Sequence, residues 1–317
     1  MSLGYLLRRG FGAIPLLLAI SLILFAIVHM APGGPLDVYA DNPSVTPAAL
    51  EQIRRAYGLD QTLPVQYLKW LHAMIAGEWG YSIRTGRPVL AEIIDRLPAT
   101  LLLGVSSMLL SLLLALPVGI IAACQRGKAI DQFVTLLSFS GISIPVFWLG
   151  LLLQLLLSIR LGWLPAAGYT VFGDASMTDR LAHLVMPAGV MALATAATWS
   201  RFLRASLIGI LEQDYVRTAY AKGRGLAGVV MWHGLRNAAI PFVTVAALDL
   251  ASIISGAVIT ETVFAWPGIG RLFVESMNGR DYPVLMGLMM LGSLALVLAN
   301  LAADIACALI DPRIRYD

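Results

Sequence analysis

Side chains that commonly carry out catalysis are few in this sequence and far apart. Its four histidines are His29, His72, His183 and His233. None has a serine or cysteine placed nearby in a pattern typical of a nucleophile with its base, and no Gly-x-Ser-x-Gly elbow occurs. Cys124 and Cys307 lack the spacing of a metal site or a redox pair. No G-x-x-x-x-G-K-[ST] phosphate-binding loop is present. We therefore expect no catalytic residue, no metal and no cofactor bound by this chain, and no ATP hydrolysis by the chain alone.

Acidic side chains inside apolar runs point to a different kind of chemistry. Asp249 interrupts an otherwise apolar run over 237–260, while Glu261 and Asp304 lie near the ends of such runs. Ionisable groups at membrane depth are costly and often mark a substrate or ion route. Asp249 and Glu261 are therefore candidate pathway or gate residues, and Asp249 could attract a substrate amine. A structural polar contact between helices is the alternative for Asp249. An ion-coupled secondary transporter is the alternative function, although the paired ionisable groups expected of one are not evident.

The elements that must position these residues are membrane spans. The chain is 58% hydrophobic and 13% charged, compared with about 45–50% and about 25% in soluble domains. A helix needs about 20 apolar residues to cross a bilayer. Runs of that kind cover 10–36, 97–125, 132–159, 181–200, 237–260 and 282–303. The sequence predicts an all-α polytopic membrane protein with about six transmembrane helices.

The loops between these spans predict the orientation. Lys and Arg are enriched in the short loops that an inside N-terminus places in the cytoplasm, as the positive-inside rule requires. Arg8 and Arg9 precede the first apolar run, which is too long for the core of a cleaved signal peptide. We expect an uncleaved first span, with both termini cytoplasmic in a bacterial inner membrane.

Segment 37–96 is expected to be a periplasmic helical cap. Thr46 and Pro47 form a helix start, and Gly58 closes that helix. A second helix begins at Pro64 and ends near Gly77, and a third short helix follows Pro88. The predicted division is 1–36 for the N-terminal segment and first span, 37–96 for the cap, and 97–317 for a five-helix transmembrane core with a cytoplasmic loop at 201–240.

The segment between the fourth and fifth spans is basic and amphipathic. Residues 215–222 and 229–236 predict two short helices broken around Gly223-Arg224-Gly225. Two interpretations remain open at this point. The segment either docks on a protein partner or lies on anionic lipid without one.

Several motifs in this region and elsewhere resemble one transporter family. Two stretches resemble the cytoplasmic coupling loop of dipeptide and oligopeptide ATP-binding-cassette (ABC) permeases. They are Asp214-Tyr215-Val216-Arg217-Thr218-Ala219-Tyr220-Ala221-Lys222-Gly223 and His233-Gly234-Leu235-Arg236-Asn237-Ala238. Residues 260–270, 280–283 and 311–315 are similar to the same family, as are the N-terminal 5–9 and 32–35. The long segment after the first span resembles the first, B-type, permease of peptide, nickel and glutathione importers.

The resemblance implies a fold, partners and coupling residues. The fold would be that of a type I ABC importer transmembrane domain, non-catalytic and forming half of the translocation pathway. The partners would be a second permease, two ATPases that bind ATP and Mg²⁺, and a periplasmic or lipid-anchored solute-binding protein. The loop would dock on an ATPase, with small residues allowing close approach. The implied coupling residues are Arg217, Ala219, Lys222, Gly223, Arg224, His233, Arg236 and Asn237.

The sequence departs from the general importer pattern at two places. Arg217-Thr218-Ala219 stands where that pattern has Glu-Ala-Ala, and Pro241 comes five residues late, as in the peptide-type variant. Asp249 stands where relatives are expected to have an amide, so substrate preference does not transfer through this position. The substrate, whether a dipeptide, oligopeptide, glutathione, nickel chelate or saccharide, is not determined by the sequence.

Overall fold

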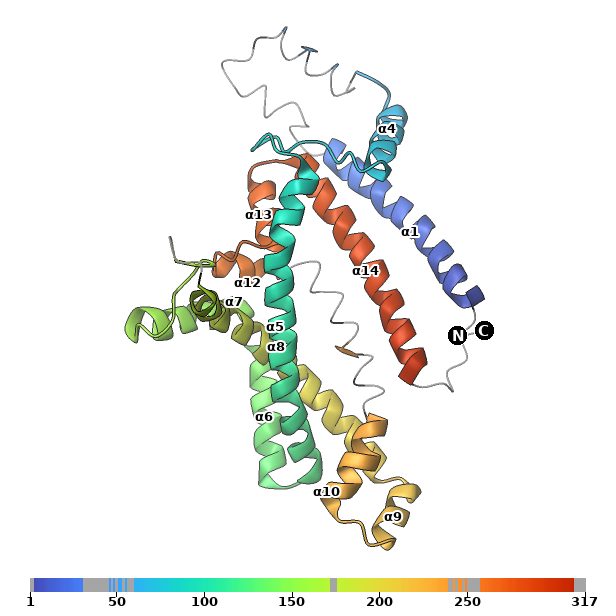
Figure 1. The fold of residues 1–317 in the computed structure, drawn as a ribbon, viewed down its shortest axis with the longest axis vertical. Coiled ribbons are helices and arrows are strands. Elements are labelled where there is room, and N and C mark those ends of the chain that lie inside the picture. The colour runs from blue at the N-terminus through green and yellow to red at the C-terminus, as the bar shows by residue number, and fades with distance from the viewer. Residues whose placement is uncertain are drawn as a thin grey trace. The chain divides into compact units, whose positions relative to one another are not determined.

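The structure is a computed structural model. It describes residues 3–30, 46, 48, 51–52, 55, 60–171, 176–238, 242, 245–246, 249 and 257–310. Within these residues the regular secondary structure is helical, with one isolated bridge between Tyr81 and Pro88 and no strand (Figure 1).

Long apolar helices dominate the described chain. They are α1 (Leu3–Met30), α5 (Val89–Cys124), α8 (Met177–Leu211) and α14 (Tyr282–Ile310). All four are long and apolar enough to cross a membrane, and a bent helix pair over 129–160 adds a fifth if the pair forms one span. Four of the predicted spans are thus present as long helices, and the bent pair covers the apolar run of a fifth. The sixth, over 237–260, falls mostly outside the described residues.

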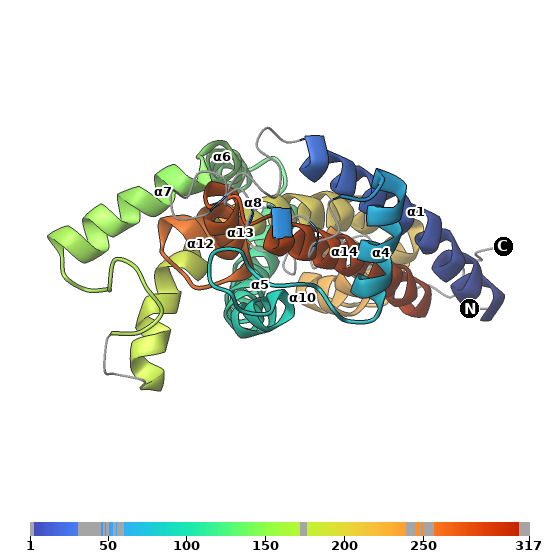
Figure 2. The ribbon, with the colours of Figure 1, turned by 90° about the horizontal axis from the view of Figure 1, so that it is seen from above.

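The bent pair corrects the prediction of one continuous run over 132–159. Helix α6 (Ala129–Ser143) and the segment formed by α7 (Val146–Leu153) and the π-helix η1 (Gln154–Arg160) meet at 95° (Figure 2). Pro145 causes the break, because a proline disfavours helical backbone in the residue before it. Ile144 accordingly has extended angles, φ −80° and ψ 122°.

Two helices extend beyond the apolar runs from which they were predicted. The predicted third cap helix after Pro88 is not separate, because α5 runs without a break from Val89. No Gly or Pro lies between Val89 and Leu97 to end it. Helix α8 begins after Ser176, whose hydroxyl accepts a hydrogen bond from the Asp179 N–H at 3.2 Å. It continues to Leu211, so the first part of the predicted loop 201–240 is helical and continuous with α8.

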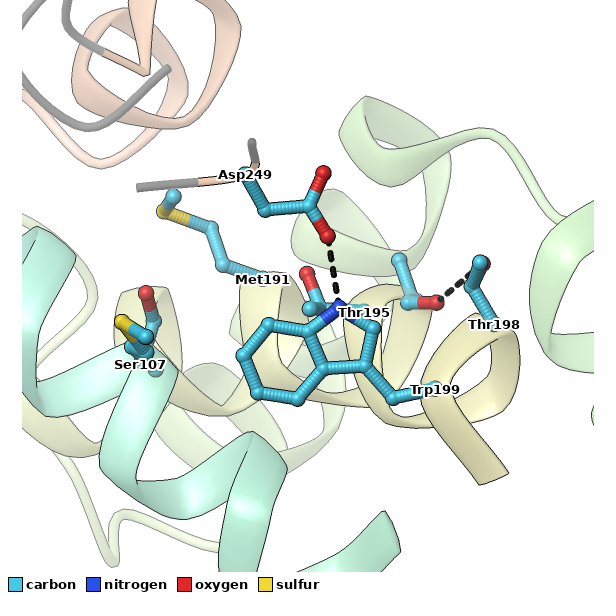
Figure 3. A pocket seen from close by; sticks show the side chains of 8 residues that line it. Ser107, Met191, Thr195, Thr198, Trp199 and Asp249 are labelled. Carbon is cyan, nitrogen blue, oxygen red and sulfur yellow. Dashed lines mark hydrogen bonds between the residues drawn. The ribbon is translucent and has the colours of Figure 1, made fainter. Parts of the chain in front are cut away.

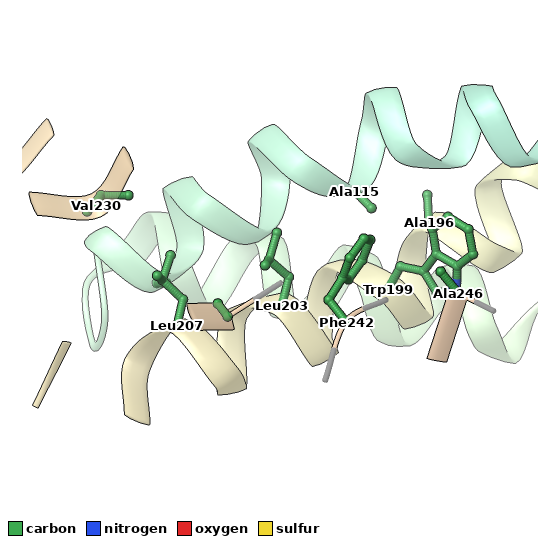
Figure 4. Packing of buried hydrophobic residues seen from close by; sticks show 10 residues of the cluster. Ala115, Ala196, Trp199, Leu203, Leu207, Val230, Phe242 and Ala246 are labelled. Carbon is green, nitrogen blue, oxygen red and sulfur yellow. The ribbon is translucent and has the colours of Figure 1, made fainter. Parts of the chain in front are cut away.

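The chain forms two compact units. The first consists mainly of Pro98–Arg271 and Leu298–Asp317, and the second of Ser2–Leu97 and Leu272–Val297. In the first unit, Trp199, Leu203 and Leu207 of α8 form a buried core with alanines of α5 and with Phe242 (Figure 4). The division at 36 and 96, drawn from membrane topology, stays a prediction.

In the second unit, α4 (Leu63–Ile75) packs on α1. This helix confirms the prediction of a helix from Pro64 to near Gly77. Phe25 and Val28 of α1 form a cluster that includes Tyr67 and Trp70 of α4. The Ser21 and Tyr67 hydroxyls are 2.9 Å apart. The predicted helix between Thr46 and Gly58 lies largely outside the described residues.

A buried carboxylate fixes the loop before α5 in the same unit. Asp281 accepts hydrogen bonds from the Ser82 hydroxyl at 2.5 Å and from the backbone N–H groups of Ile83 and Arg84 at 3.1 and 3.3 Å. Its carboxylate therefore ties the loop at 82–84 to the turn that precedes α14. This contact gives Asp281, one of the residues of the resembling stretch 280–283, a structural role.

Candidate functional site

The loop after α8 is built from two short helical segments joined by a tight turn. Helix α9 (Asp214–Ala221) is followed by α10 (Leu226–Val229), which continues as the π-helix η2 (Val230–Gly234). The sequence prediction of two short helices broken at Gly223–Gly225 is therefore confirmed. Both segments lie at one end of the first unit (Figure 1).

The turn depends on the backbone freedom of Gly223. Its φ is +83°, a left-handed conformation that side-chain-bearing residues rarely adopt. The Gly223 N–H donates to the Tyr220 carbonyl at 2.9 Å, and the Arg224 N–H donates to the Ala219 carbonyl at 3.3 Å. These two bonds form the Schellman motif that ends many helices. The turn therefore reverses the chain between α9 and α10 at a fixed position.

A small apolar core holds the two segments together and against α8. Val216 and Ala219 of α9 and Val229 of α10 are buried in one cluster, with Leu211 packed against it. A Cβ added at Gly234 would lie 2.8 Å from Leu207 Cδ1, so η2 approaches α8 closely. The Asn237 side-chain amide donates to the Tyr215 hydroxyl at 3.2 Å and to the His233 carbonyl at 2.8 Å. The loop is therefore packed onto the helix that carries it.

The outer face of this loop combines cationic and apolar side chains. Its exposed cationic, aromatic and large apolar side chains are Tyr215, Arg217, Tyr220, Lys222, Arg224, Leu226, Met231, Trp232 and Arg236, and Trp232 is exposed at 72%. Aromatic, Met and Arg side chains are enriched where proteins bind one another. We call these nine residues the loop face.

The predicted coupling residues divide between this face and the interior. Arg217, Lys222, Arg224 and Arg236 belong to the loop face, and Gly223 and Asn237 are also exposed. Ala219 lies inside the apolar core instead, so its small size serves the packing of the loop on itself. His233 is half-buried.

Ion pairs place the loop beside the turn between α5 and α6. Arg126 of that turn pairs with Glu212, the residue that follows α8. Deeper in, Arg204 of α8 holds Asp131 of α6 through two bonds of 2.5 and 2.7 Å, and the Gly127 N–H donates to the same carboxylate at 2.9 Å. The turn and the loop therefore lie on the same side, as the predicted topology requires. Sequence reasoning missed the pair Asp131–Arg204, because its partners are 73 residues apart and no local spacing links them.

Glu261, a candidate gate residue, is fully buried. It lies in α12 (Val258–Val263), and its carboxylate accepts hydrogen bonds from the Thr100 hydroxyl at 2.8 Å and from the Arg271 N–H at 2.9 Å. Arg271 is in the first turn of α13 (Ile269–Asn278). A carboxylate at a helix N-terminus satisfies N–H groups that have no partner within the helix and is favoured by the helix dipole. This geometry gives Glu261 a structural task in joining α5, α12 and α13.

Asp249, the other candidate pathway residue, contacts α8. Its carboxylate accepts a hydrogen bond of 2.6 Å from the Trp199 indole N–H. Asp249 also lines a cavity between α5 and α8 (Figure 3). Asp249 thus makes a contact with α8 and lines a cavity, and its role as a pathway residue stays a prediction.

Metal ligands do not gather in the part of the chain that the structure describes. No group of three or more His, Cys, Asp or Glu residues there could hold a metal ion. Two histidines have described hydrogen bonds to nearby groups. His29 contacts the Phe25 carbonyl and the Gln66 side chain, and His183 contacts the Asp179 carbonyl.

Several long apolar helices and an amphipathic helical loop define the class of multi-pass helical membrane proteins. The chain belongs to the family of binding-protein-dependent transport system inner membrane components, whose model matches residues 115–316. The model of the N-terminal part of such components matches residues 2–104. Members of this family are membrane permeases of ABC transporters, so the predicted resemblance is confirmed.

Close relatives cover nearly the whole chain. The oligopeptide transport system permease protein AppB of Bacillus subtilis is 44% identical over 99% of both chains. The glutathione transport system permease protein GsiC of Escherichia coli K12 is 40% identical over 99% of both chains. The inward-facing MetNI methionine ABC transporter matches with a TM-score of 0.58 over 70% of this chain and 97% of that chain, at 18% identity. This last similarity confirms the predicted type I importer fold.

Proposed function

We propose that this chain is one of two permease subunits of an ATP-driven importer for peptides or related small solutes. It forms half of the translocation pathway and couples to cytoplasmic ATPases through residues 215–237. Its complex contains a second permease, two ATPases that bind ATP and Mg²⁺, and a periplasmic or lipid-anchored solute-binding protein that docks on the outer cap. Its termini lie in the cytoplasm.

The observation that carries this proposal is the packing of the loop. A segment that only rested on lipid would need an amphipathic helix and no connection to the bundle. Here α9, α10 and η2 share a core with the end of α8, while the loop face presents arginines and aromatic side chains outward. Force applied to such a packed loop is transmitted to α8 as a rigid body, and a rigid-body change of packed helices can alternate access to a pathway. The likeness to permeases of oligopeptide and glutathione transport systems supports the solute class.

The test of this proposal is a bulky substitution in the turn. Gly223→Trp is expected to lower ATP-driven solute uptake by the assembled importer roughly tenfold or more, because truncating or obstructing a central contact typically costs an interface about 2 kcal/mol. No heavy atom among the described residues lies within 4 Å of the added Cβ, so the large side chain projects outward from the loop. Uptake into proteoliposomes and ATPase activity stimulated by the solute-binding protein are the measurements.

Gly127→Trp is the matched control. Gly127 also has a positive φ, +74°, and open space around its Cβ, but it lies in the α5–α6 turn outside the loop. Both substitutions therefore carry the same backbone strain, about 1–2 kcal/mol. Equal loss of uptake in both variants, or normal uptake with Gly223→Trp, would contradict coupling through this loop. Transport by the purified chain alone under an ion gradient would instead support a secondary transporter.

A further inference from the structure

A cavity of about 290 Å³ lies between α5 and α8 of the first unit. It is lined by Ser107, Met108, Met191, Ala194, Thr195, Thr198, Trp199 and Asp249. Figure 3 shows the Asp249 carboxylate pointing toward the indole ring of Trp199, with Met191 and Thr195 beside it. The lining thus brings together one acid, three hydroxyl groups, an indole ring and two methionines.

The cavity lies midway along its helices. Ser107 is near the middle of the 36-residue α5, and Thr195 is near the middle of the 35-residue α8. Both helices are long and apolar enough to span a membrane, and Asp249 lies within the predicted span 237–260. An ionisable side chain within a membrane span is expensive to keep and marks a functional site by default. An uncharged side chain could accept the Trp199 hydrogen bond equally well, so that bond alone does not explain why an acid is present.

The chemistry of the lining suits a positive charge. The Trp199 indole N–H donates to Asp249 at 2.6 Å and orients the carboxylate. A carboxylate has about four lone-pair positions, so accepting an indole N–H is compatible with accepting an ammonium as well. Serine and threonine hydroxyl oxygens can accept the remaining ammonium hydrogens, and an indole ring attracts cations through its π face. No Lys or Arg is among the described residues that line the cavity.

We propose that this cavity is a subsite for a protonated amine of the transported solute, such as the N-terminal ammonium of a peptide. The inference rests on the proposed function and deepens it, because it assigns a chemical group of the solute to named residues of this permease. Asp249 supplies the countercharge, and Trp199 positions the carboxylate. Ser107, Thr195 and Thr198 supply the neutral acceptors.

Asp249→Asn separates this role from a structural one. The asparagine carbonyl still accepts the Trp199 N–H bond, but the negative charge is gone. A structural contact survives this substitution, whereas attraction of a cation does not.

The experiment measures the electrostatic preference of the cavity with thiol reagents of opposite charge. Cys124 and Cys307 are first replaced by alanine, and Thr195→Cys is introduced in the assembled importer in proteoliposomes. The probes are trimethylammonium-ethyl and sulfonatoethyl methanethiosulfonate, with rates normalised to their rates with 2-mercaptoethanol. We expect the cationic reagent to react roughly tenfold faster, as a single charge several ångströms away in a medium of intermediate polarity predicts. Adding Asp249→Asn is expected to bring the two normalised rates together.

A second thiol position controls for general effects of the substitution. Thr218→Cys, on the exposed surface of α9, is expected to keep its reagent preference when Asp249→Asn is added. If the cavity position reacts with neither reagent, or shows no cationic preference, the amine subsite is refuted. The same holds if its preference survives Asp249→Asn. Should the double variant fail to assemble, the preference at Thr195→Cys alone decides.

The same proteoliposomes separate this inference from the proposed function. They are also assayed for ATP-dependent uptake of a labelled oligopeptide mixture delivered by the solute-binding protein. ATP-dependent uptake with no charge preference at Thr195→Cys refutes only the amine subsite. Absence of ATP-dependent uptake in the unsubstituted complex refutes the proposed function, whatever the thiol rates show.

Discussion

Replacing Arg204 by alanine is expected to destabilise the folded chain by about 3 kcal/mol, because the substitution leaves a buried carboxylate without its partner. The Asp131 side chain is only 6% exposed, and Arg204 holds it in a two-bond arrangement with 29% of its own side chain exposed. Paired guanidinium–carboxylate bonds of this kind are among the strong hydrogen bonds of proteins. One Gly127 N–H bond to Asp131 would remain, and it cannot balance a full charge.

Two variants make this prediction specific. Arg126→Ala removes the exposed pair with Glu212, whose side chains are 57% and 60% exposed, and should cost less than about 1 kcal/mol. The double variant Asp131→Leu with Arg204→Met removes both charges and should recover most of the lost stability, as apolar replacement of buried pairs often does. Unfolding of the purified chain in detergent is the measurement. Equal destabilisation by Arg204→Ala and Arg126→Ala would show that the inner pair is not what holds α6 to α8.

Gly270→Ala is expected to destabilise the region around Glu261 by about 3 kcal/mol, at the upper end of the usual cost of overpacking. A Cβ at this position would lie 2.7 Å from Val258 Cα and 2.8 Å from Val258 N. Backbone atoms cannot move aside as the end of a flexible side chain can. It would also lie 3.0 Å from Glu261 Oε2, within the group of hydrogen bonds that joins α12 to α13.

The control for this substitution is Gly209→Ala, in α8, where no described heavy atom lies within 4 Å of the added Cβ. Alanine there should be neutral or slightly stabilising, since it favours helix over glycine. Thermal unfolding and the yield of assembled complex are the measurements. If Gly270→Ala and Gly209→Ala unfold at the same temperature, the close approach of α13 to α12 is not required for stability.

The sequence was sufficient for elements that depend on neighbouring residues. Apolar runs of bilayer length predicted the spans that correspond to α1, α5, α8 and α14. Gly223 predicted the break between α9 and α10, because only glycine adopts its φ of +83° without strain. The motif at 214–238 also led to the correct family.

The sequence was insufficient where an element depends on what lies next to it in space. The run over 132–159 gave no measure of how far Pro145 would turn the chain, and apolar composition alone could not place the ends of α5 and α8. Ala219, expected at a partner's surface, instead fills the core between α9 and α10. A small apolar residue suits either environment, so its type does not decide between them.

The sequence by itself therefore determined the membrane environment, the spans, the family and the helical form of the inner loop. Each of these follows from composition or from patterns within a few neighbouring residues. Only the tertiary structure decided the partners of the acidic side chains. Asp131 meets Arg204, Glu261 meets Thr100, Asp281 meets Ser82 and Asp249 meets Trp199. These partners are 50 to 199 residues apart. A buried polar group must find a partner, but which residue supplies it is set by helix packing, which no local pattern records.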